Sequence, residues 1–219
     1  MKRLIVWIKT HTYSLALTYW PYYLVAFFSL EHWRVPKYTI QCFLDEKIPF
    51  CEWFVIPYLL WFPLLAVSLL FFMIKSKEDF QNLCFLMFSG MTICLMIYGI
   101  LPTGLSLRCE VVNKNLLCQV VNLLYQVDTP TNVCPSIHVA STVAINRVVH
   151  RSPLLEKHKK ILWGSSCLTL FICLSTLLIK QHAIIDVICG YFLTELLYQV
   201  TYRLDWRKHL ARTRLRILL

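Results

Sequence analysis

The chain has 219 residues, of which 58% are hydrophobic and only 16% are charged. Soluble domains carry about a quarter charged residues, so this composition excludes a disordered or fibrous chain and argues against a soluble domain. The formal net charge of +10 could attract nucleic acid. In so apolar a chain we interpret it as membrane topology and expect no nucleic-acid partner, because basic residues collect in cytoplasmic loops.

Six segments are predicted to cross a membrane as helices, which gives an all-α bundle of six transmembrane helices. A bilayer core of ~30 Å needs ~20 apolar residues in a helix. Three segments reach this length plainly and contain no charged residue, namely 53–74, 80–101 and 161–179. In chain order, the six predicted spans are residues 13–30, 53–74, 80–101, 136–149, 161–179 and 183–204.

The other three segments depart from the simple pattern. Residues 13–30 are uncharged and rich in aromatics, and no small-residue cleavage site follows them, so we expect a retained helix and not a signal peptide. Residues 183–204 contain three charged side chains. Residues 136–149 are short and partly polar, but their small side chains suit close packing inside a bundle.

The basic residues predict the orientation of these spans. Of the 22 Lys and Arg residues, 16 fall before the first span, between the second and third, between the fourth and fifth, or after the sixth, when Arg147 and Arg203 at the ends of their spans are included. This asymmetry puts both termini in the cytoplasm. We expect one membrane domain, 1–204, in the cell membrane, followed by a basic cytoplasmic tail, 205–219. The tail could lie on anionic lipid or be a solvated end.

The ten cysteines show no spacing of a metal site, since there is no CxxC and no zinc-finger-like Cys/His cluster. We therefore expect no metal. Five cysteines fall on the predicted outer side. There Cys42 with Cys51, or Cys109 with Cys118, could form a disulfide if the compartment is oxidising.

Polar residues inside membrane spans are costly and by default functional, and here several fall on one predicted face. Pro135 and Ser136 open the fourth span, and His138 lies just inside it. Proline is favoured at a helix start, and the free N–H groups that follow can bind an anion. Ser136 can add a hydroxyl donor.

His182 and Asp186 are four residues apart, so in a helix they share one face. A carboxylate there can accept the Nδ1–H of the imidazole, which leaves Nε2 free as a nucleophile or base. Arg108, after the third span, can clamp two phosphate oxygens. Lys180 can add a positive charge. Each of these residues alone is more often a structural hydrogen-bonding or loop residue; their convergence on one face indicates function.

These residues resemble the three motifs of the type-2 phosphatidic acid phosphatase superfamily, KxxxxxxRP, PSGH and SRxxxxxHxxxD, carried on a six-helix core. The resemblance covers residues 53–204. The matching residues are Arg108 in the first motif, Pro135, Ser136 and His138 in the second, and Ser175, His182 and Asp186 in the third. The departures are Leu101 for Lys, Cys109 for Pro, Ile137 for Gly and Thr176 for Arg.

The resemblance implies a metal-independent phosphoryl transfer without a cofactor. His182 is then the nucleophile that forms a phosphohistidine, Asp186 orients it, and His138 protonates the leaving alkoxide. Arg108 and Ser136, with Lys180, hold the phosphoryl oxygens. The substrate is a phospholipid or a prenyl phosphate in the bilayer. The expected activity is a lipid-phosphate phosphatase with its site on the extracytoplasmic side.

Two alternatives stay open from the sequence. The strings CPSIHV and KQHxxxDV are more similar to the inositol phosphorylceramide synthase and sphingomyelin synthase branch, which transfers a phospho-headgroup to a lipid hydroxyl instead of water. A non-catalytic lipid-binding protein or a small transporter is the alternative of another class. Finally, the DxPxN stretch at Asp128, Pro130 and Asn132 could shape a headgroup pocket or be a turn before a helix.

Overall fold

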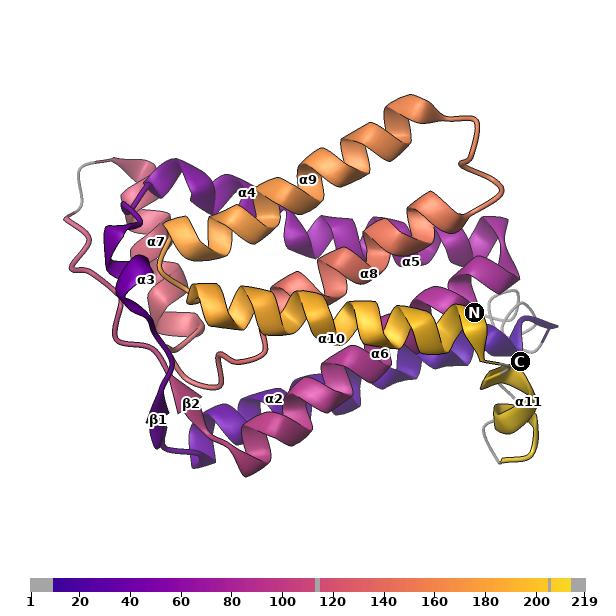
Figure 1. Cartoon of the computed structure of the whole chain (residues 1–219), viewed down its shortest axis with the longest axis horizontal. Helices are drawn as coiled ribbons and strands as arrows, with labels where there is room; N and C mark the ends of the chain where they lie inside the picture. Colours follow the sequence, from indigo (N-terminus) through magenta and orange to yellow (C-terminus); the bar gives the residue numbers. More distant parts are fainter. Residues whose placement is uncertain (1–9, 113–114, 205, 214–219) are drawn as a thin grey trace, which may run out of the picture.

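The computed structural model of the chain describes residues 10–112, 115–204 and 206–213. The described part is mainly helical, with long helices running side by side along the longest axis (Figure 1). Its elements, in chain order, are the 3-10 helix η1 (Thr12–Thr18), α2 (Tyr19–Trp33), β1 (Tyr38–Thr39), α3 (Phe43–Lys47), the 3-10 helix η2 (Glu52–Phe54), α4 (Val55–Leu59), α5 (Trp61–Lys75), α6 (Lys77–Ile100), β2 (Thr103–Gly104), α7 (Leu116–Val127), α8 (Ile137–Arg151), α9 (Lys159–Leu178), α10 (Ile184–Arg203) and α11 (Trp206–Ala211).

Four helical stretches are long and apolar enough to cross a membrane, which confirms four of the predicted spans. They are Glu52–Lys75, Lys77–Ile100, Lys159–Leu178 and Ile184–Arg203. The first of these combines η2, α4 and α5. Their outward side chains are large and apolar, as expected for a surface in contact with lipid. Examples are Phe62, Val67, Phe192 and Leu196.

The other two predicted spans are helical but shorter. The segment predicted at 13–30 begins as η1, and its α-helix, α2, has 15 residues. The segment predicted at 136–149 becomes α8, also with 15 residues. A further amphipathic helix, α7, was not predicted from the sequence.

Helix α8 lies at the centre of the bundle, where it packs against α5, α6, α9 and α10. Ten of its 15 residues are buried, among them Ala140, Ser141, Thr142 and Ala144. These small side chains let neighbouring helices approach closely. Because α8 is surrounded by protein, its composition does not need to match that of a helix facing lipid.

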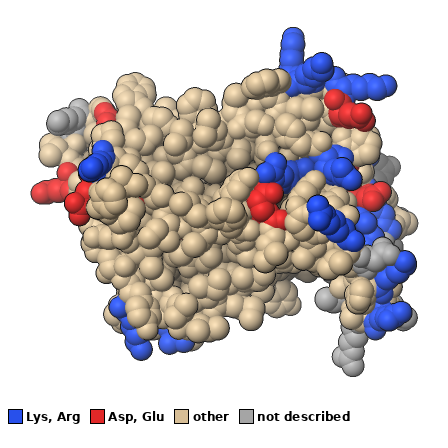
Figure 2. Space-filling model, in the orientation of Figure 1, with Lys and Arg blue, Asp and Glu red and all other residues tan. Residues whose placement is uncertain are grey.

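The two ends of the bundle differ in charge. The end that carries α11 and the loop before α9 bears most of the blue Lys and Arg side chains in Figure 2, and the middle is almost uniformly uncharged. The basic side chains at that end include Arg151, Lys157, Lys159, Lys160 and Arg207. The opposite end holds α3, α7 and the short parallel pair β1–β2, in which Tyr38 aligns with Thr103 (Figure 1).

All ten cysteines are unpaired thiols, so neither Cys42 with Cys51 nor Cys109 with Cys118 forms a disulfide here. Of the basic tail predicted at 205–219, the structure describes residues 206–213. There Trp206, at the start of α11, stacks on Phe85 of α6 with 4.3 Å between ring centroids. The beginning of the tail is thus packed on the bundle.

Helix α10 meets the start of α8 at Gly190. A Cβ atom on Gly190 would lie 2.7 Å from the Ser136 carbonyl oxygen and 3.3 Å from the Val139 Cβ. The absence of a side chain therefore allows the two backbones to approach closely. A little further along, the Thr194 hydroxyl donates to the Ala140 carbonyl at 2.9 Å. This helix pair holds the N-terminal turn of α8 in place.

We predict that Gly190→Ala lowers the free energy of unfolding by about 1–3 kcal/mol, because the added methyl group overpacks the contact with the Ser136 backbone. The matched control is Gly164→Ala on α9, where an added Cβ meets no atom within 4 Å. Thermal unfolding of both variants in detergent measures the difference. Equal midpoints for the two variants would contradict the close contact.

Candidate active site

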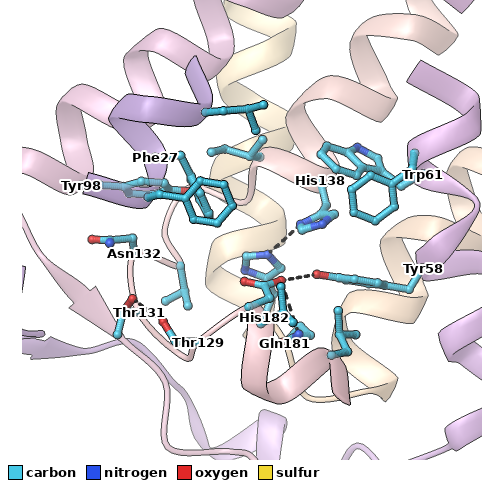
Figure 3. Close-up of a pocket in the computed structure, with 18 of the residues that line it drawn as sticks. Phe27, Tyr58, Trp61, Tyr98, Thr129, Thr131, Asn132, His138, Gln181 and His182 are labelled. Carbon is cyan, nitrogen blue, oxygen red and sulfur yellow. Dashed lines mark hydrogen bonds between the residues drawn. The ribbon is translucent and has the colours of Figure 1, made fainter. Parts of the chain in front are cut away.

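A cavity of about 170 Å³ opens at the end of the bundle that carries α7 and the two short strands. Its walls come from α2, α4, α5, α6, the end of α7, the α7–α8 loop, the start of α8 and the turn before α10. His138 and His182 both line it. Figure 3 shows the two imidazoles between Tyr58 and Trp61 on one side and Asn132, Thr129 and Thr131 on the other. Segments far apart in the sequence thus enclose one small space.

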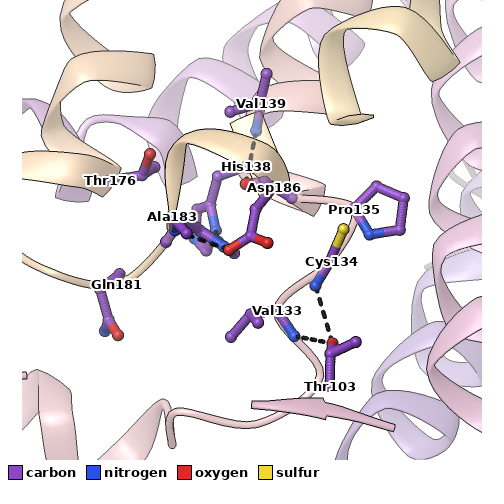
Figure 4. A network of polar contacts seen from close by, with 12 residues as sticks. Thr103, Val133, Cys134, Pro135, His138, Val139, Thr176, Gln181, Ala183 and Asp186 are labelled. Atoms are coloured by element: carbon purple, nitrogen blue, oxygen red, sulfur yellow. Dashed lines mark hydrogen bonds and ion pairs between the residues drawn. The ribbon is translucent and has the colours of Figure 1, made fainter. Parts of the chain in front are cut away.

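His182 and Asp186 are in contact, with Nδ1 and Oδ2 3.3 Å apart. His182 lies just before α10, and not on its face as we predicted. The Asp186 carboxylate turns back over the first turn of the helix and also accepts the Ala183 amide at 2.8 Å (Figure 4). Asp186 is fully buried. Its position is therefore fixed by the helix start, and through it the orientation of the His182 ring.

The second imidazole completes a line of three groups. His138 Nδ1 lies 3.4 Å from His182 Nε2. When a neutral His182 donates its Nδ1–H to Asp186, Nε2 carries no proton, so His138 Nδ1 is the donor in this contact. The His138 ring is held beside Tyr58 and Trp61, at centroid distances of 4.6 and 4.4 Å. The Trp61 indole in turn donates to Ser141 at 2.8 Å.

Ser136 is the N-cap of α8, so Pro135 precedes the helix and is not at its start as we predicted. The Ser136 hydroxyl, which we expected to donate to an anion, accepts the Val139 amide at 3.4 Å. The Ser136 amide donates to the Asp186 carbonyl at 3.1 Å. Two of the N–H groups expected to bind an anion are therefore used within the protein. Ser136 is fully buried and does not line the cavity.

The segment before Ser136 is held from two sides, as Figure 4 shows in part. The Thr103 hydroxyl accepts the amides of Val133 and Cys134 at 3.1 and 3.2 Å. The Tyr98 hydroxyl donates to the Pro135 carbonyl at 2.5 Å. The Cys134–Pro135 peptide bond is cis. These contacts connect the loop after α6 to the start of α8.

Arg108 lies beside the cavity and is not part of its wall. Its guanidinium donates to the Tyr125 carbonyl at 2.9 Å, to the Asp128 carbonyl and to Gln181 Oε1. It also lies 4.4 Å from the Tyr125 ring centroid. Burial lowers the pKa of Arg108, and Asp128 opposes that shift, but a guanidinium stays charged. Arg108 thus braces the α7–α8 loop, and its predicted role as a phosphate ligand is not supported by these contacts.

Lys180 also has a different place from the one we predicted. Its buried ammonium donates to the carbonyls of Asp45 and Ile48, at 2.8 and 2.6 Å. It does not line the cavity. Its φ of 55° places it in the left-handed region, in the tight turn that ends α9. The Lys180 ammonium therefore anchors the segment after β1 and is not directed into the cavity.

Asp128 and Asn132, from the DxPxN stretch, both line the cavity. Asp128 Oδ2 accepts the Tyr58 hydroxyl at 2.6 Å and Gln181 Nε2 at 3.4 Å. Burial raises the pKa of Asp128, while the Tyr58 hydrogen bond, His182 and Arg108 oppose the shift. Asn132 is buried, and its Nδ2 has no partner among the described residues. The sequence raised this stretch as a headgroup pocket or a turn, and these contacts favour the pocket.

Tyr58 and Gln181 were not predicted from the sequence. Gln181 is next to His182, and Tyr58 lies in an apolar span, so the only signal was a polar group inside an apolar segment. Among the described residues, no three His, Cys, Asp or Glu side chains gather as metal ligands.

Comparisons of this chain with protein-family models, with curated proteins and with solved structures find no match. The resemblance to the phosphatase superfamily therefore rests on the motif residues of the sequence alone.

We predict that Lys180→Met lowers the free energy of unfolding by about 1–3 kcal/mol, because the buried carbonyls of Asp45 and Ile48 lose their donor. The control is Lys157→Met, which changes an exposed lysine in the loop before α9. Thermal midpoints in detergent should fall for the first variant and stay constant for the second. An unchanged thermal midpoint for Lys180→Met would contradict an anchoring role for Lys180.

Proposed function

We propose that this protein is an integral membrane enzyme that hydrolyses a lipid phosphomonoester or diphosphate through a phosphohistidine at His182. The observation that carries the proposal is the line Asp186–His182–His138, with contacts of 3.3 and 3.4 Å, at the wall of a small cavity. Two imidazoles in contact, one of them oriented by a buried carboxylate, are the groups that a two-step phosphoryl transfer needs.

In the first step, His182 Nε2 forms a bond to phosphorus while the bond from phosphorus to the lipid oxygen breaks. The electron pair goes to that oxygen, which takes the Nδ1 proton of His138; His138 enters this step as an imidazolium, protonated on both ring nitrogens, and leaves it neutral. Asp186 accepts the Nδ1–H of His182 and stabilises the positive charge that develops on the ring. In the second step, His138 takes a proton from water, the hydroxide attacks phosphorus, and the bond to Nε2 breaks.

The distance between the imidazoles sets a requirement for this reaction. Nε2 must approach phosphorus to about 3–3.5 Å before attack, and His138 must be within about 2.6–3.2 Å of the leaving oxygen. His138 Nδ1 and His182 Nε2 lie only 3.4 Å apart, so the His138 N–H is directed at Nε2. This N–H must therefore turn from Nε2 to the leaving oxygen when a phosphoryl group binds.

The mouth of the cavity supports a lipid substrate. Four of its lining residues are large, apolar and exposed: Leu24 and Phe28 of α2, Phe62 of α5 and Val127 of α7. Their exposed fractions run from 45% to 64%. Such side chains at the rim are expected to contact the bilayer, so acyl or prenyl chains can leave the cavity between α2 and α5 and stay in lipid.

The proposed topology has six spans, with α2 and α8 added to the four long helices, and both termini in the cytoplasm. The support is the charge asymmetry: the end that carries α11 is strongly basic and the end with the cavity is not (Figure 2). Basic residues collect on the cytoplasmic side. The cavity then faces the extracytoplasmic side of the cell membrane.

The second candidate is a lipid phosphotransferase that moves a phospho-headgroup to a lipid hydroxyl. The observation that favours it is the wall of the cavity, whose described residues are mostly apolar or aromatic and include no Lys or Arg. Such a wall disfavours water and a doubly charged phosphomonoester. Release of free phosphate from a phosphomonoester lipid supports the phosphatase, and headgroup exchange between two lipids without free phosphate supports the phosphotransferase.

We expect His182→Ala to lower turnover by roughly 10³-fold or more, because the nucleophile is lost. The control is His150→Ala, an exposed histidine near the far end of α8. With a phosphate-labelled lipid, the wild-type protein should give an acid-labile, base-stable protein adduct that His182→Ala does not give. A folded His182→Ala variant with near-normal turnover would exclude the phosphohistidine.

Thiol labelling tests the proposed orientation. Cys109 is exposed at the cavity end, so we expect a membrane-impermeant maleimide to label it in intact cells. In a double variant, Cys109→Ser removes this thiol and Lys157→Cys introduces one at the opposite end of the bundle. Labelling at position 157 should require permeabilised cells. The reverse pattern would put the active site in the cytoplasm.

A further inference from the structure

The cavity wall has an unusual set of charged groups for a site that binds phosphate. Besides tyrosines, the described residues that line it contribute one carboxylate, Asp128, and the imidazoles of His138 and His182. The two nearest predicted cations, Arg108 and Lys180, bind other protein groups. A phosphate ester placed here meets a carboxylate without a lysine or arginine on the wall.

Asp128 is held by hydrogen bonds that fix the direction of its carboxylate and oppose the rise in its pKa that burial causes. Its Oδ2 accepts two donors, the Tyr58 hydroxyl and Gln181 Nε2. Gln181 in turn accepts from Arg108, which also donates to the Asp128 backbone carbonyl. Hydrogen bonds to a carboxylate favour its ionised form. Both of these contacts involve Oδ2, which leaves Oδ1 as an acceptor for a ligand.

Much of the rest of the wall is aromatic. Tyr23 and Phe27 of α2, Tyr58 of α4, Trp61 of α5 and Tyr98 of α6 all line the cavity. Figure 3 shows four of these rings around the two imidazoles. The faces of aromatic rings attract cations, and the attraction is strongest where water is excluded. A carboxylate within an aromatic wall is a site for an ammonium group.

We propose that Asp128 is a specificity-determining residue, whose carboxylate binds an ammonium group that the substrate carries close to its phosphate. This inference rests on the proposed function, since it assigns a substrate class to the His182 site. The substrate is then a zwitterionic lipid phosphate ester, which supplies the positive charge that the protein does not place on the cavity wall. The ammonium belongs to the headgroup or to the lipid amine itself.

The same bonds form and break, and the same proton transfers occur, with such a substrate. With an ammonium headgroup, Nε2 of His182 bonds to phosphorus, the bond to the lipid oxygen breaks, and that oxygen takes the His138 proton. The phospho-headgroup stays on His182 until an acceptor hydroxyl, from water or a second lipid, gives its proton to His138 and attacks. Throughout, Asp128 holds the ammonium group and so fixes the side of phosphorus that faces His182.

The experiment compares pairs of lipids that differ only in the positive charge, with the full-length wild-type protein in detergent. One pair is phosphatidylcholine and its 3,3-dimethylbutyl ester, in which carbon replaces the ammonium nitrogen. The other is a sphingoid-base phosphate and its N-acetyl derivative. Affinity is measured by native mass spectrometry. We expect the charged member of one pair to bind about tenfold or more tightly than its neutral partner, as for a charge-assisted contact.

Asp128→Asn should reduce this preference for the charged lipid to near unity, and Asp128→Glu should retain part of it. The control is Glu110→Gln, which changes an exposed acid in the loop after α6 and should keep the full preference. The pair that shows the preference identifies the source of the ammonium group. Equal affinities within both pairs for the wild type, a measurement that needs no variant, would overturn the proposal, as would a preference that survives in Asp128→Asn. Turnover is measured separately, so an ammonium preference without turnover would reject the proposed function and keep the binding site.

Discussion

The reacting groups depend on the close approach of α10 to the first turn of α8. Gly190 allows the backbones to meet, and the Ser136 amide then donates to the Asp186 carbonyl at 3.1 Å. This contact joins the two helix starts that carry the imidazoles. His138 follows Ser136 by two residues and His182 precedes Asp186 by four, so the distance between the rings is set by the same docking. The first N–H groups of a helix lack intrahelical partners, and here the Ser136 hydroxyl and the Asp186 carboxylate accept the amides of Val139 and Ala183, which fixes both helix starts.

The polar groups in the loops at this end of the bundle form hydrogen bonds with one another and so hold the site together. Thr103 holds the amides before Pro135, Lys180 holds the carbonyls of Asp45 and Ile48, and Arg108 holds the turn after α7. A buried polar group without a partner costs free energy comparable to a lost hydrogen bond. The two cations therefore stabilise the scaffold around the cavity, and the cavity wall itself is left with aromatic rings, amides, hydroxyls and one carboxylate.

Because the two cations bind loops and do not face the cavity, the imidazoles and the cavity wall bear on different parts of the proposed function. The imidazole pair with Asp186 supports phosphoryl transfer whatever the acceptor. In the proposed binding mode, the described residues of the wall favour a zwitterionic ester, whose ammonium pairs with Asp128, over a phosphomonoester with two negative charges, which gains no lysine or arginine there. The exposed apolar rim at Leu24, Phe28 and Phe62 would then keep the lipid chain of such a substrate in the bilayer while its phosphate reaches His182.

The sequence by itself determined the features that depend on neighbouring residues. Apolar length predicted the four long helices, and the order Pro135, Ser136, His138 predicted that a helix starts there. The spacing of His182 and Asp186 predicted their contact, although His182 precedes α10 and does not share a helix face with Asp186. Each of these patterns extends over a few turns of helix, so local periodicity and capping chemistry are sufficient to read it.

Only the tertiary structure decided the features that join distant segments. Asp128 meets Tyr58, 70 residues away, and Lys180 meets Asp45, 135 residues away. Neither contact leaves a periodic signal in the sequence. The short, partly polar α8 forms a central helix because four other helices cover it, which its own residues could not reveal. Long-range packing therefore chose which cations stabilise loops and which groups face the cavity, since a side chain binds whatever partner the fold brings within reach.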